Sequence, residues 1–438
     1  MYLFIKSFGC QMNEHDSQKI ASILEEEGYE LTEDPEKADC IILNTCSVRE
    51  KPERKVYSAL GRLLPLKRKK PSLLIGVGGC VAQQVGEKLL KEAPHLDFVF
   101  GTHQIHRVGE MVRAARAGIR SLDVSMVDDV PSLHRFPTPA PGQVKAYVTI
   151  MQGCDNRCSY CIVPHVRGPE RSRPPEEILQ EVRQLAQAGI KEITLLGQNV
   201  NSYGRNLPKP LTFPRLLELL EEVEGIERIR FTTSHPKDLS VELMEAMAEL
   251  RKVCEHLHLP VQSGSNRVLQ AMNRGYTREE YLEKVEALRK MVPGVALTTD
   301  LIVGFPGETE EDFELTLDLL RQVRFDGMYS FKYSPRPFTS AYGMRDDVPQ
   351  EVKAERLARA QALQDRISWE ILENCIGKVE EILVEGPSPR GEGQVTGRTR
   401  TNRIVHLKGD AGQLVGRMVK VRIEKSLRHS LWGERVED

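Results

Sequence analysis

The stretch YVTIMQGCDNRCSYC, residues 147–161, joins a short apolar run to three cysteines within eight residues. The run Tyr147–Met151 has the length and composition of a buried strand. Cys154, Cys158 and Cys161 follow it, and closely spaced thiolates suit an iron–sulfur cluster or zinc. Three cysteines leave one iron of a 4Fe–4S cluster open to chelate a substrate. A zinc knuckle or a redox pair is the alternative, because the last two cysteines alone permit either.

The alternation of strand and helix continues beyond this stretch. Six runs are predicted strands: Tyr147–Met151, Ile193–Leu196, Ile229–Thr233, His256–Val261, Ala296–Val303 and Met328–Tyr333. Helical patterns lie between them, such as Pro175–Ala188, Val241–Leu250 and Glu310–Val323. Six βα units are fewer than the eight of a complete barrel, so we expect an open, partial (β/α)6 barrel. Its active face is expected at the carboxyl ends of the strands.

The first part of the chain shows the same alternation. The predicted strands are Tyr2–Lys6, Cys40–Leu43 and Leu73–Val77, and the predicted helices are Asp16–Glu27, Glu50–Arg68 and Val81–Glu92. This order indicates an α/β domain with a doubly wound parallel sheet. Cys10, Cys46 and Cys80 each follow one predicted strand, at the edge where such sheets bind ligands. They are therefore either a second group of metal ligands or small buried hydrophobic residues.

The last part of the chain is short and β-rich. A helical stretch, Gln350–Cys375, leads into four β-like pieces, which predict a small β-barrel: Val379–Val384, Gly393–Thr396, Ile404–Leu407 and Met418–Ile423. From Arg390 to Arg428 there are ten Lys or Arg against three Asp or Glu, a local footprint for nucleic acid. The candidate RNA-contacting residues are Arg398, Arg400, Arg403, Lys408, Arg417 and Arg428.

These patterns predict four parts along the chain. They are an N-terminal domain at 1–118, a linker at 119–139, a central domain at 140–370 and a C-terminal domain at 371–438. Four prolines crowd the stretch Asp128–Gln143, which has neither helical nor strand periodicity and is typical of a linker.

The composition excludes several classes of protein. Of 438 residues, 40% are hydrophobic and 28% charged, and no apolar run reaches the length of a membrane span. The first residues lack a signal peptide, so we expect a cytoplasmic protein with no membrane partner. The net charge of −2 argues against a general polyanion binder. Nine cysteines in a reducing compartment favour metal binding or catalysis over disulfides.

Further motifs extend the cysteine pattern across nearly the whole chain. They are Ser7–Asn13 (SFGCQMN), Asn44–Arg49 (NTCSVR), Gly78–Cys80 (GGC), Gly197–Tyr203 (GQNVNSY), Pro260–Ser265 (PVQSGS) and Gly304–Thr309 (GFPGET). With Tyr160 before the last cysteine of the first triad, the chain resembles the methylthiotransferases of the radical S-adenosylmethionine (SAM) superfamily. The residues after Cys10 and the run Asn199–Asn201 are similar to the MiaB branch.

The resemblance implies two 4Fe–4S clusters, SAM as cofactor, and a C-terminal TRAM barrel that binds RNA. Cys154, Cys158 and Cys161 are expected to hold the cluster that cleaves SAM to a 5′-deoxyadenosyl radical, and Tyr160 to contact the adenine. Cys10, Cys46 and Cys80 are expected to hold an auxiliary cluster that carries the sulfur. The MiaB branch adds a methylthio group to carbon 2 of dimethylallyladenosine beside the anticodon of tRNA. One SAM would supply the methyl group and another the radical. A reducing electron donor and a sulfur source are further expected partners.

Four polar residues are candidate SAM contacts because they are expected at the ends of predicted barrel strands: Gln198, Ser234, Gln262 and Asp300. Each could equally be a turn or capping residue. Two other functions stay open. One is methylthiolation of a different target, such as a ribosomal protein. The other is a non-catalytic, tRNA-binding iron–sulfur protein.

Overall fold

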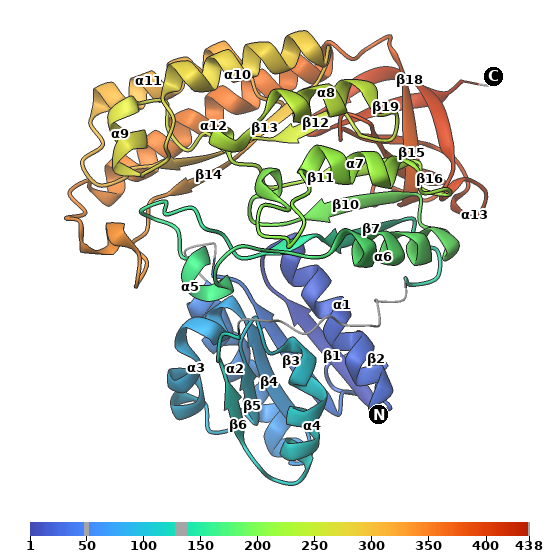
Figure 1. Cartoon of the computed structure of the whole chain (residues 1–438). Helices are drawn as coiled ribbons and strands as arrows, with labels where there is room; N and C mark the ends of the chain where they lie inside the picture. The colour runs from blue at the N-terminus through green and yellow to red at the C-terminus, as the bar shows by residue number, and fades with distance from the viewer. Residues whose placement is uncertain (48–51, 128–138, 437–438) are drawn as a thin grey trace. The chain divides into compact units, whose positions relative to one another are not determined.

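The computed structural model describes residues 1–47, 52–127 and 139–436 (Figure 1). The predicted helix start at Glu50 and most of the predicted linker stretch Asp128–Gln143 lie outside the described residues. The chain divides into two compact units. The first comprises Met1–Thr138, Gln152–Asn156 and Ile162–Glu170, and the second comprises Pro139–Met151, Arg157–Cys161 and Arg171–Asp438. Among the described residues, no helix is long and apolar enough to cross a membrane.

The first unit is built on a parallel sheet of six strands in the order β2-β1-β3-β4-β5-β6. The strands are β1 (Tyr2–Ser7), β2 (Glu30–Leu31), β3 (Cys40–Thr45), β4 (Leu74–Gly79), β5 (Phe98–Phe100) and β6 (Ser121–Asp123). The helices are α1 (Gln11–Glu26), α2 (Pro52–Lys69), α3 (Cys80–Glu92), α4 (Val108–Arg116) and α5 (Val163–Arg167), with a 3-10 turn η1 (Ile105–Arg107). Apolar residues of α1 and α4 pack on one face and those of α2 and α3 on the other. The predicted doubly wound sheet is confirmed.

The first domain contains β2, β5 and α4, which were not predicted, and differs from its prediction in two further places. Helix α1 begins at Gln11, five residues before the predicted start, because polar residues of its first turns are buried against neighbouring loops. Strand β6 lies inside the predicted linker 119–139 and forms the sixth strand of the sheet, so the sheet extends past residue 118. Strand β6 has three residues and a single apolar side chain, and a run this short shows no pattern that would predict a strand.

The central part of the second unit contains six parallel strands in chain order. They form two sheets, β7-β10-β11 and β12-β13-β14. The strands are β7 (Lys145–Thr149), β10 (Glu192–Leu196), β11 (Arg228–Phe231), β12 (His256–His258), β13 (Ala296–Val303) and β14 (Gly327–Lys332). The helices are α6 (Pro175–Gln187), α7 (Phe213–Glu221), α8 (Val241–Glu249), α9 (Asn266–Ala271), α10 (Arg278–Met291) and α11 (Glu310–Val323). Short elements are β8 (Met151–Gln152), β9 (Arg171–Ser172), η2 (Val200–Ser202), η3 (Pro236–Asp238) and η4 (Ser340–Gly343). The strand order fits the predicted partial barrel.

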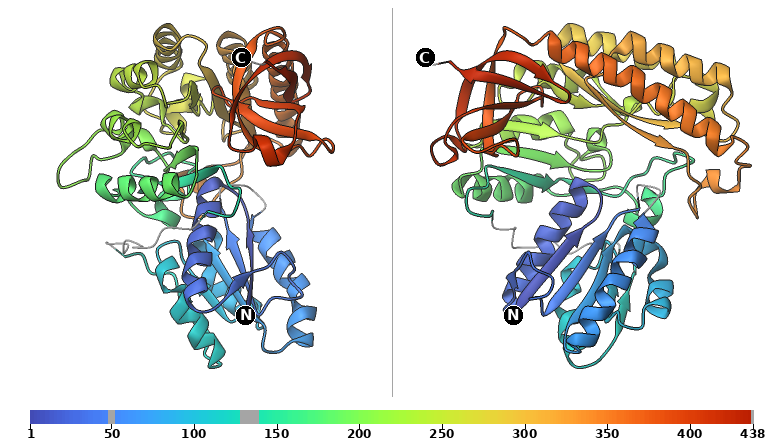
Figure 2. Two further views of the ribbon diagram at one scale, coloured as in Figure 1. Left: turned by 90° about the vertical axis from the view of Figure 1, so that its right-hand side faces the viewer. Right: turned by 180° about the vertical axis from the view of Figure 1, so that it is seen from behind.

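The second unit ends in a closed β-barrel in the order β15-β16-β17-β19-β18. Its elements are β15 (Val379–Pro387), β16 (Gln394–Thr399), β17 (Ile404–Lys408), α13 (Ala411–Leu414), β18 (Met418–Leu427) and β19 (Ser430–Arg435). Helix α12 (Gln350–Glu373) lies along β14 and leads into this barrel (Figure 2). The small barrel is confirmed, although β19 was not predicted and α12 runs across the predicted boundary at residue 370.

Candidate active site

Cys10, Cys46 and Cys80 lie at the carboxyl ends of three adjacent strands. Cys10 is the N-cap of α1 after β1, Cys46 follows β3, and Cys80 is the first residue of α3 after β4. Because β1, β3 and β4 are neighbours, the three loops meet at one edge of the sheet. Cys46 hydrogen-bonds Cys10, and Cys10 and Cys80 interact electrostatically. The structure thus brings together the three cysteines that sequence reasoning placed at strand ends.

Two glycines allow the cysteine loops to approach one another. Gly9 has a φ of +112°, and a Cβ there would lie 2.2 Å from Cβ of Cys46 and 2.7 Å from its Sγ. Gly79 has a φ of +89°, and its Cβ would lie 2.3 Å from the carbonyl oxygen of Thr45. L-residues with a side chain rarely adopt these φ values, and non-bonded atoms do not come this close. Side chains are therefore excluded immediately before Cys10 and Cys80.

A buried amide network fixes the first two loops. Asn13 Nδ2 donates to the side-chain oxygen of Asn44 (3.1 Å) and to the carbonyl of Thr45 (2.8 Å). Asn44 Nδ2 donates back to the carbonyl of Asn13 (2.8 Å), and Cys10 Sγ donates to Asn13 Oδ1 (3.2 Å). Both asparagines are almost fully buried, so losing one would leave the other unsatisfied. Sequence reasoning quoted both residues in motifs but gave neither a role.

A buried arginine supplies positive charge beside these cysteines. Arg167, 4% exposed, donates to Asp16 at 2.8 Å and hydrogen-bonds Cys80. The hydrogen bond from Cys46 lowers the pKa of Cys10 to about 6, with the charge of Arg167 acting in the same direction against burial. Burial raises the pKa of Cys80. A thiolate, which is the ligating form of cysteine, therefore forms readily at Cys10.

Arg167 belongs to a segment that packs into the first unit although it follows the second cysteine motif. Thr102 Oγ1 donates to the carbonyl of Val166 (2.6 Å), and a ring nitrogen of His103 lies 3.0 Å from the carbonyl oxygen of Arg167. Ile162 and Val166 also pack against Cys80. Sequence reasoning missed Arg167, because its only signal was its place six residues after Cys161.

The donor set of the first unit fits a cluster better than a single ion. Among residues 1–47, 52–127 and 139–436, no three His, Cys, Asp or Glu side chains are close enough to hold one metal ion. An iron–sulfur cube does not need such an approach, because each thiolate binds a different iron. Three cysteines, one with a lowered pKa and two beside a buried cation, suit that chemistry.

The second cysteine motif contributes to both units. Cys154 belongs to the first unit, and Cys158, Tyr160 and Cys161 belong to the second. In the second unit the Arg274 guanidinium, 4% exposed, donates to Cys158 Sγ and to Tyr160 Oη, both at 3.3 Å. It also donates to the carbonyl of Pro260 at 2.8 Å. Arg274 therefore fixes a predicted cluster ligand and the predicted adenine contact together.

His235 is a second buried partner of Cys158. Burial, aided by the charge of Arg274, lowers the pKa of His235 to about 2, so the ring is neutral at physiological pH. Its Nδ1 accepts a hydrogen bond from the backbone N–H of Lys237, which places the proton on Nε2. Nε2 lies 3.9 Å from Cys158 Sγ. Neither His235 nor Arg274 was a sequence candidate.

Polar atoms lacking a hydrogen-bond partner gather after the carboxyl ends of the central strands. Within the described part of the chain, Ser234 Oγ, Gln262 Oε1 and both amide atoms of Asn201 are buried and unsatisfied. An unsatisfied buried polar group costs about 1–3 kcal/mol, so these atoms favour a polar ligand. Ser234 and Gln262 were predicted SAM contacts, whereas Asn201 was missed although it stands in a quoted motif. Gln198, also predicted, lies directly after β10 and is half-buried.

The backbone is strained at the same strand ends. Thr233 and Gln262 have φ values of +68° and +67°, which cost free energy in residues other than glycine and are enriched at functional sites. Asp300 differs from its prediction, because it lies inside β13, paired with Tyr329, and not at the strand end. Its Oδ1 is 3.5 Å from Nε2 of His258, and its side chain is 30% exposed. Asp300 can therefore still face a ligand from within the strand.

Comparison with known proteins identifies the family. Three family models match the chain: Uncharacterized protein family UPF0004 at residues 2–101, Radical SAM superfamily at 148–320 and TRAM domain at 373–436. The tRNA-2-methylthio-N(6)-dimethylallyladenosine synthase of Geobacter sulfurreducens is 54% identical over 100% of this chain and 98% of its own. That of Syntrophus aciditrophicus is 52% identical over 99% and 94%. The chain belongs to the MiaB branch of the radical SAM methylthiotransferases.

Solved structures show the same fold at low identity. The radical SAM methyltransferase TsrM from Kitasatospora setae covers 90% of this chain with a TM-score of 0.58, 13% identity and 78% coverage of its own chain. Family membership establishes an iron–sulfur enzyme that uses SAM. The methylthiotransferase therefore has a radical SAM domain and a TRAM barrel, as the sequence motifs predicted.

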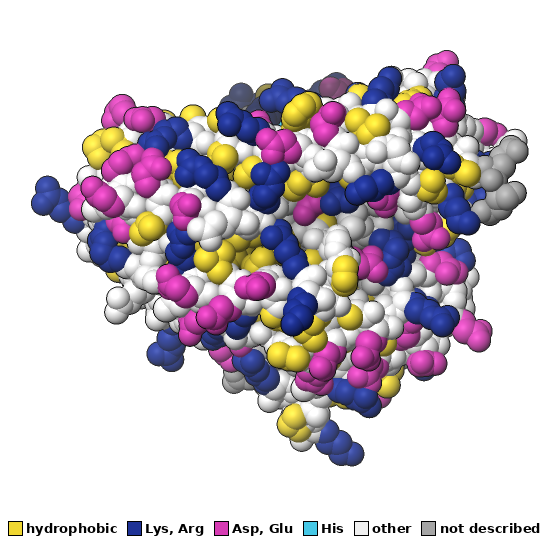
Figure 3. All heavy atoms as spheres, turned by 90° about the horizontal axis from the view of Figure 1, so that it is seen from above, with side chains coloured by type: hydrophobic (Ala, Val, Ile, Leu, Met, Phe, Trp, Pro, Cys, Tyr) yellow, Lys and Arg dark blue, Asp and Glu magenta, His cyan; other side chains and the backbone are white. Residues whose placement is uncertain are grey.

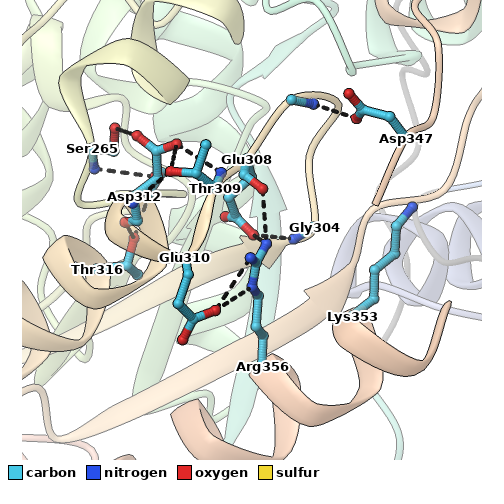
Figure 4. Close-up of polar contacts among 12 residues, drawn as sticks. Ser265, Gly304, Glu308, Thr309, Glu310, Asp312, Thr316, Asp347, Lys353 and Arg356 are labelled. Carbon is cyan, nitrogen blue, oxygen red and sulfur yellow. Dashed lines mark hydrogen bonds and ion pairs between the residues drawn. The ribbon is translucent and has the colours of Figure 1, made fainter. Parts of the chain in front are cut away.

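The Gly304–Thr309 motif of the methylthiotransferase forms a structural brace (Figure 4). Glu308 accepts hydrogen bonds from the backbone N–H of Gly304 (2.7 Å) and from the Arg356 guanidinium (2.9 Å). Thr309 and Asp312 form the capping box of α11, and Ser265 donates to Asp312 (2.6 Å). The brace thus joins the Pro260–Ser265 motif to the loop after β13. These hydrogen bonds explain why the motif contains polar residues, and no ligand is needed to explain them.

Three of the predicted RNA-contacting residues are engaged within the protein. Arg400 pairs with Glu255 (2.8 Å), Arg403 with Asp326 (2.6 Å) and Arg398 with Glu385 on the adjacent barrel strand (3.4 Å). These pairs give the three side chains a structural role and leave their contact with RNA a prediction. The other three predicted residues are exposed: Lys408, Arg417 and Arg428.

Two buried arginines of the radical SAM domain hydrogen-bond the backbone of the barrel. Arg228 donates to the carbonyl of Arg398 (2.6 Å) and Arg230 to the carbonyls of Thr399 and Arg400 (2.8 and 2.7 Å). Arg228 is at the amino end of β11, the end opposite the candidate SAM residues. The barrel edge at β16 therefore faces the radical SAM domain.

The two sets of basic residues should respond differently to mutation. Arg428→Ala and Lys408→Ala are each expected to lower the salt dependence of tRNA binding by about one unit of slope, because an exposed cation can neutralise a phosphate. Arg403→Ala is expected to loosen the barrel and leave the slope unchanged, since its charge is already paired with Asp326. Titration of tRNA over a series of salt concentrations measures the slopes. A slope lowered by Arg403→Ala alone would contradict this division.

Proposed function

We propose that the protein adds a methylthio group to carbon 2 of dimethylallyladenosine beside the anticodon of tRNA. The observation that carries the proposal is the gathering of Cys10, Cys46 and Cys80 at one sheet edge, with buried Arg167 beside Cys10 and Cys80, in addition to the Cys154–Cys161 motif. A radical SAM enzyme that only generated a radical would not need a second group of three cysteines. The names of the relatives supply the nucleoside.

Two 4Fe–4S clusters are part of the proposal. Cys154, Cys158 and Cys161 would hold one, and Cys10, Cys46 and Cys80 the other. When bound, the clusters and SAM supply a 5′-deoxyadenosyl radical, a methyl group from a second SAM, and a sulfur atom for transfer.

The side chains of the protein would bind SAM and orient the cluster ligands. Arg274 and neutral His235 hold Cys158, Ser234 and Gln262 offer polar atoms to SAM, and Arg167 balances negative charge at the auxiliary cysteines. Gln198 and Asp300 stay proposed SAM contacts from the same strand edge.

The partners and setting follow from this reaction. tRNA is the proposed substrate, bound in part by the exposed basic residues of the TRAM barrel. A reducing electron donor and a source of sulfur are required, because each turnover consumes an electron for cleavage and a sulfur atom for transfer. We place the reaction in the cytoplasm, where tRNA is found and thiols stay reduced. The proposed domains are the cysteine-bearing N-terminal sheet, the radical SAM core and the barrel.

Nucleoside analysis tests the substrate. Mass spectrometry of tRNA from cells with and without the protein is expected to show methylthio-dimethylallyladenosine only when the protein is present. Unmodified dimethylallyladenosine in both samples, or a methylthio group on a ribosomal protein instead, would contradict the proposal.

Iron content tests the two-cluster assignment. Anaerobic reconstitution is expected to give about eight iron atoms per chain, and replacement of Cys154, Cys158 and Cys161 by alanine about four. Iron and sulfide assays measure both. Loss of all iron in the triple variant, or zinc in place of iron, would contradict two separate sites.

A further inference from the structure

The segment that follows β14 displays aromatic side chains to solvent. Phe338 is 65% exposed and Tyr342 is 56% exposed, and Tyr329 on β14 is 58% exposed. Phenylalanine is ordinarily among the most buried residues, so a cluster of exposed rings indicates a binding surface. We call the segment 334–345 the aromatic loop.

The aromatic loop is firmly anchored beside the second cysteine motif. The backbone N–H of Ala341 donates to the carbonyl of Ser159 (2.7 Å), the residue between Cys158 and Tyr160. Tyr333 Oη donates to the carbonyl of Ala341 (2.9 Å), and Ala341 is fully buried. The exposed rings are therefore held in place beside the predicted cluster ligands.

The backbone at Phe338 supports a functional role. Its φ is +70°, a conformation that costs free energy in a residue with a bulky side chain. Thr339 stabilises the turn, since its Oγ1 donates to the carbonyl of Arg336 at 2.7 Å. The fold thus maintains a strained turn that leaves the ring of Phe338 exposed.

Strand β14 and a small shared core connect the aromatic loop to candidate SAM residues. Tyr329 pairs in register with Asp300, and its ring packs edge-on against His258, with centroids 5.9 Å apart. Tyr160, the predicted adenine contact, packs against the small core that contains Ala341. The aromatic loop and the predicted adenine contact are therefore anchored on the same small core.

The charge of this surface suits a polyanion. Lys332, Arg336 and Arg345 lie on or beside the aromatic loop. Of the two neighbouring carboxylates, which are also exposed, Asp346 pairs with buried Lys353 (2.6 Å) and Asp347 accepts the N–H of Gly307 (Figure 4). By contrast, acidic and basic side chains are interspersed over the face drawn in Figure 3.

We propose that Phe338 and Tyr342 stack on nucleobases of the single-stranded RNA loop that flanks the reacting adenosine. The inference rests on the proposed function, because it assumes an RNA substrate. Proteins bind unpaired bases by stacking them on exposed aromatic rings while nearby cations meet the backbone. The aromatic loop provides rings and cations together, next to the residues that would hold the cofactor.

Alanine substitutions test the stacking. Phe338→Ala and Tyr342→Ala are each expected to weaken binding of an RNA hairpin, with dimethylallyladenosine in its loop, by roughly five- to a hundredfold. The salt dependence of binding should stay unchanged, because stacking neutralises no phosphate. Tyr342→Phe, which keeps the ring, should bind as the unaltered protein does. Cleavage of SAM without RNA should survive in all three variants.

Trp369→Ala is the matched control, since Trp369 is 51% exposed on α12, outside the aromatic loop. It should leave RNA affinity unchanged. Equal affinity of the unaltered protein and the Phe338→Ala/Tyr342→Ala double variant would overturn the stacking role. If the double variant keeps its RNA affinity but is reduced more slowly by a protein electron donor, the stacking role is also overturned, and the surface is assigned to that donor. If the unaltered protein binds no RNA hairpin, the proposed function itself fails.

Discussion

Replacing Cys10, Cys46 and Cys80 by alanine is expected to abolish methylthio transfer while SAM is still reductively cleaved. The reason is that Cys158, Cys161, Arg274 and the unsatisfied polar atoms after the central strands belong to the second unit, while Cys154, although it belongs to the first unit, is left unchanged. The variant should retain about half of its iron. Product analysis by liquid chromatography, for 5′-deoxyadenosine and for methylthio nucleoside, measures the two activities separately.

Cys40→Ala provides the matched control in the same sheet. Cys40 is fully buried in β3, and burial raises the pKa of its thiol far above the usual range, as expected of a structural cysteine. It should keep both activities and all of its iron. If the triple variant folds but forms no 5′-deoxyadenosine, the division of labour between the two cysteine groups is wrong.

Replacing Arg274 by methionine is expected to produce the second large effect, a near-complete loss of SAM cleavage. Methionine fills a similar volume but donates no hydrogen bond, so Cys158, Tyr160 and the carbonyl of Pro260 each lose one buried donor. Among the described residues, Cys158 Sγ then keeps only His235 Nε2 at 3.9 Å, and the Pro260 carbonyl keeps only Tyr276 Oη at 3.3 Å. Each buried acceptor left unpaired costs about 1–3 kcal/mol. Assays of 5′-deoxyadenosine formation and thermal unfolding measure the two consequences.

A redox titration separates an electronic role of Arg274 from a structural one. A positive charge beside a cluster ligand favours uptake of an electron, so its loss should lower the midpoint potential of the SAM-cleaving cluster. A tenfold change in the reduction equilibrium corresponds to about 59 mV for one electron. Arg274→Lys should recover part of the shift, and Arg228→Lys, at the far end of β11, should cause none. An unchanged potential in Arg274→Met would limit Arg274 to packing.

Much of the architecture could be predicted because the strands are buried on both faces. Strands such as β3 and β4 appear in the sequence as continuous apolar runs, and their order with the intervening helices determines the sheet topology. Strands β2, β5 and β6 were missed because runs of two or three residues are too short to show a pattern. Strand β19 was missed because its sequence, SLWGER, does not alternate between apolar and polar residues.

The candidate site could be predicted in its cysteines but not in its supporting residues. Cysteines grouped at strand ends are typical of metal binding, because thiolates are ligands that iron–sulfur clusters and zinc prefer. Arg167, at the end of the short helix α5, and Arg274, in the loop between α9 and α10, are by contrast single arginines, and a charged residue is ordinarily exposed. Their burial depends on partners distant in sequence, such as Asp16 for Arg167. Asn201 shows a further limit, since a motif identifies a residue without telling which atoms are unsatisfied.

The assignment of Gln152–Asn156 and Ile162–Glu170 to the first unit affects how the protein can be dissected or shuffled. The chain changes unit four times between residues 151 and 171, so no single cut yields two intact modules. A fragment that stops before residue 139 would lack Arg167 and leave Asp16 a buried carboxylate without its cation. If N-terminal domains were exchanged between relatives, Asp16 of one protein would meet the 162–170 segment of another. The exchange should therefore include the segment around Arg167 together with the sheet. Any gene fusion or truncated fragment that is meant to contain the N-terminal module should therefore include residues 162–170, although they follow the module in the sequence.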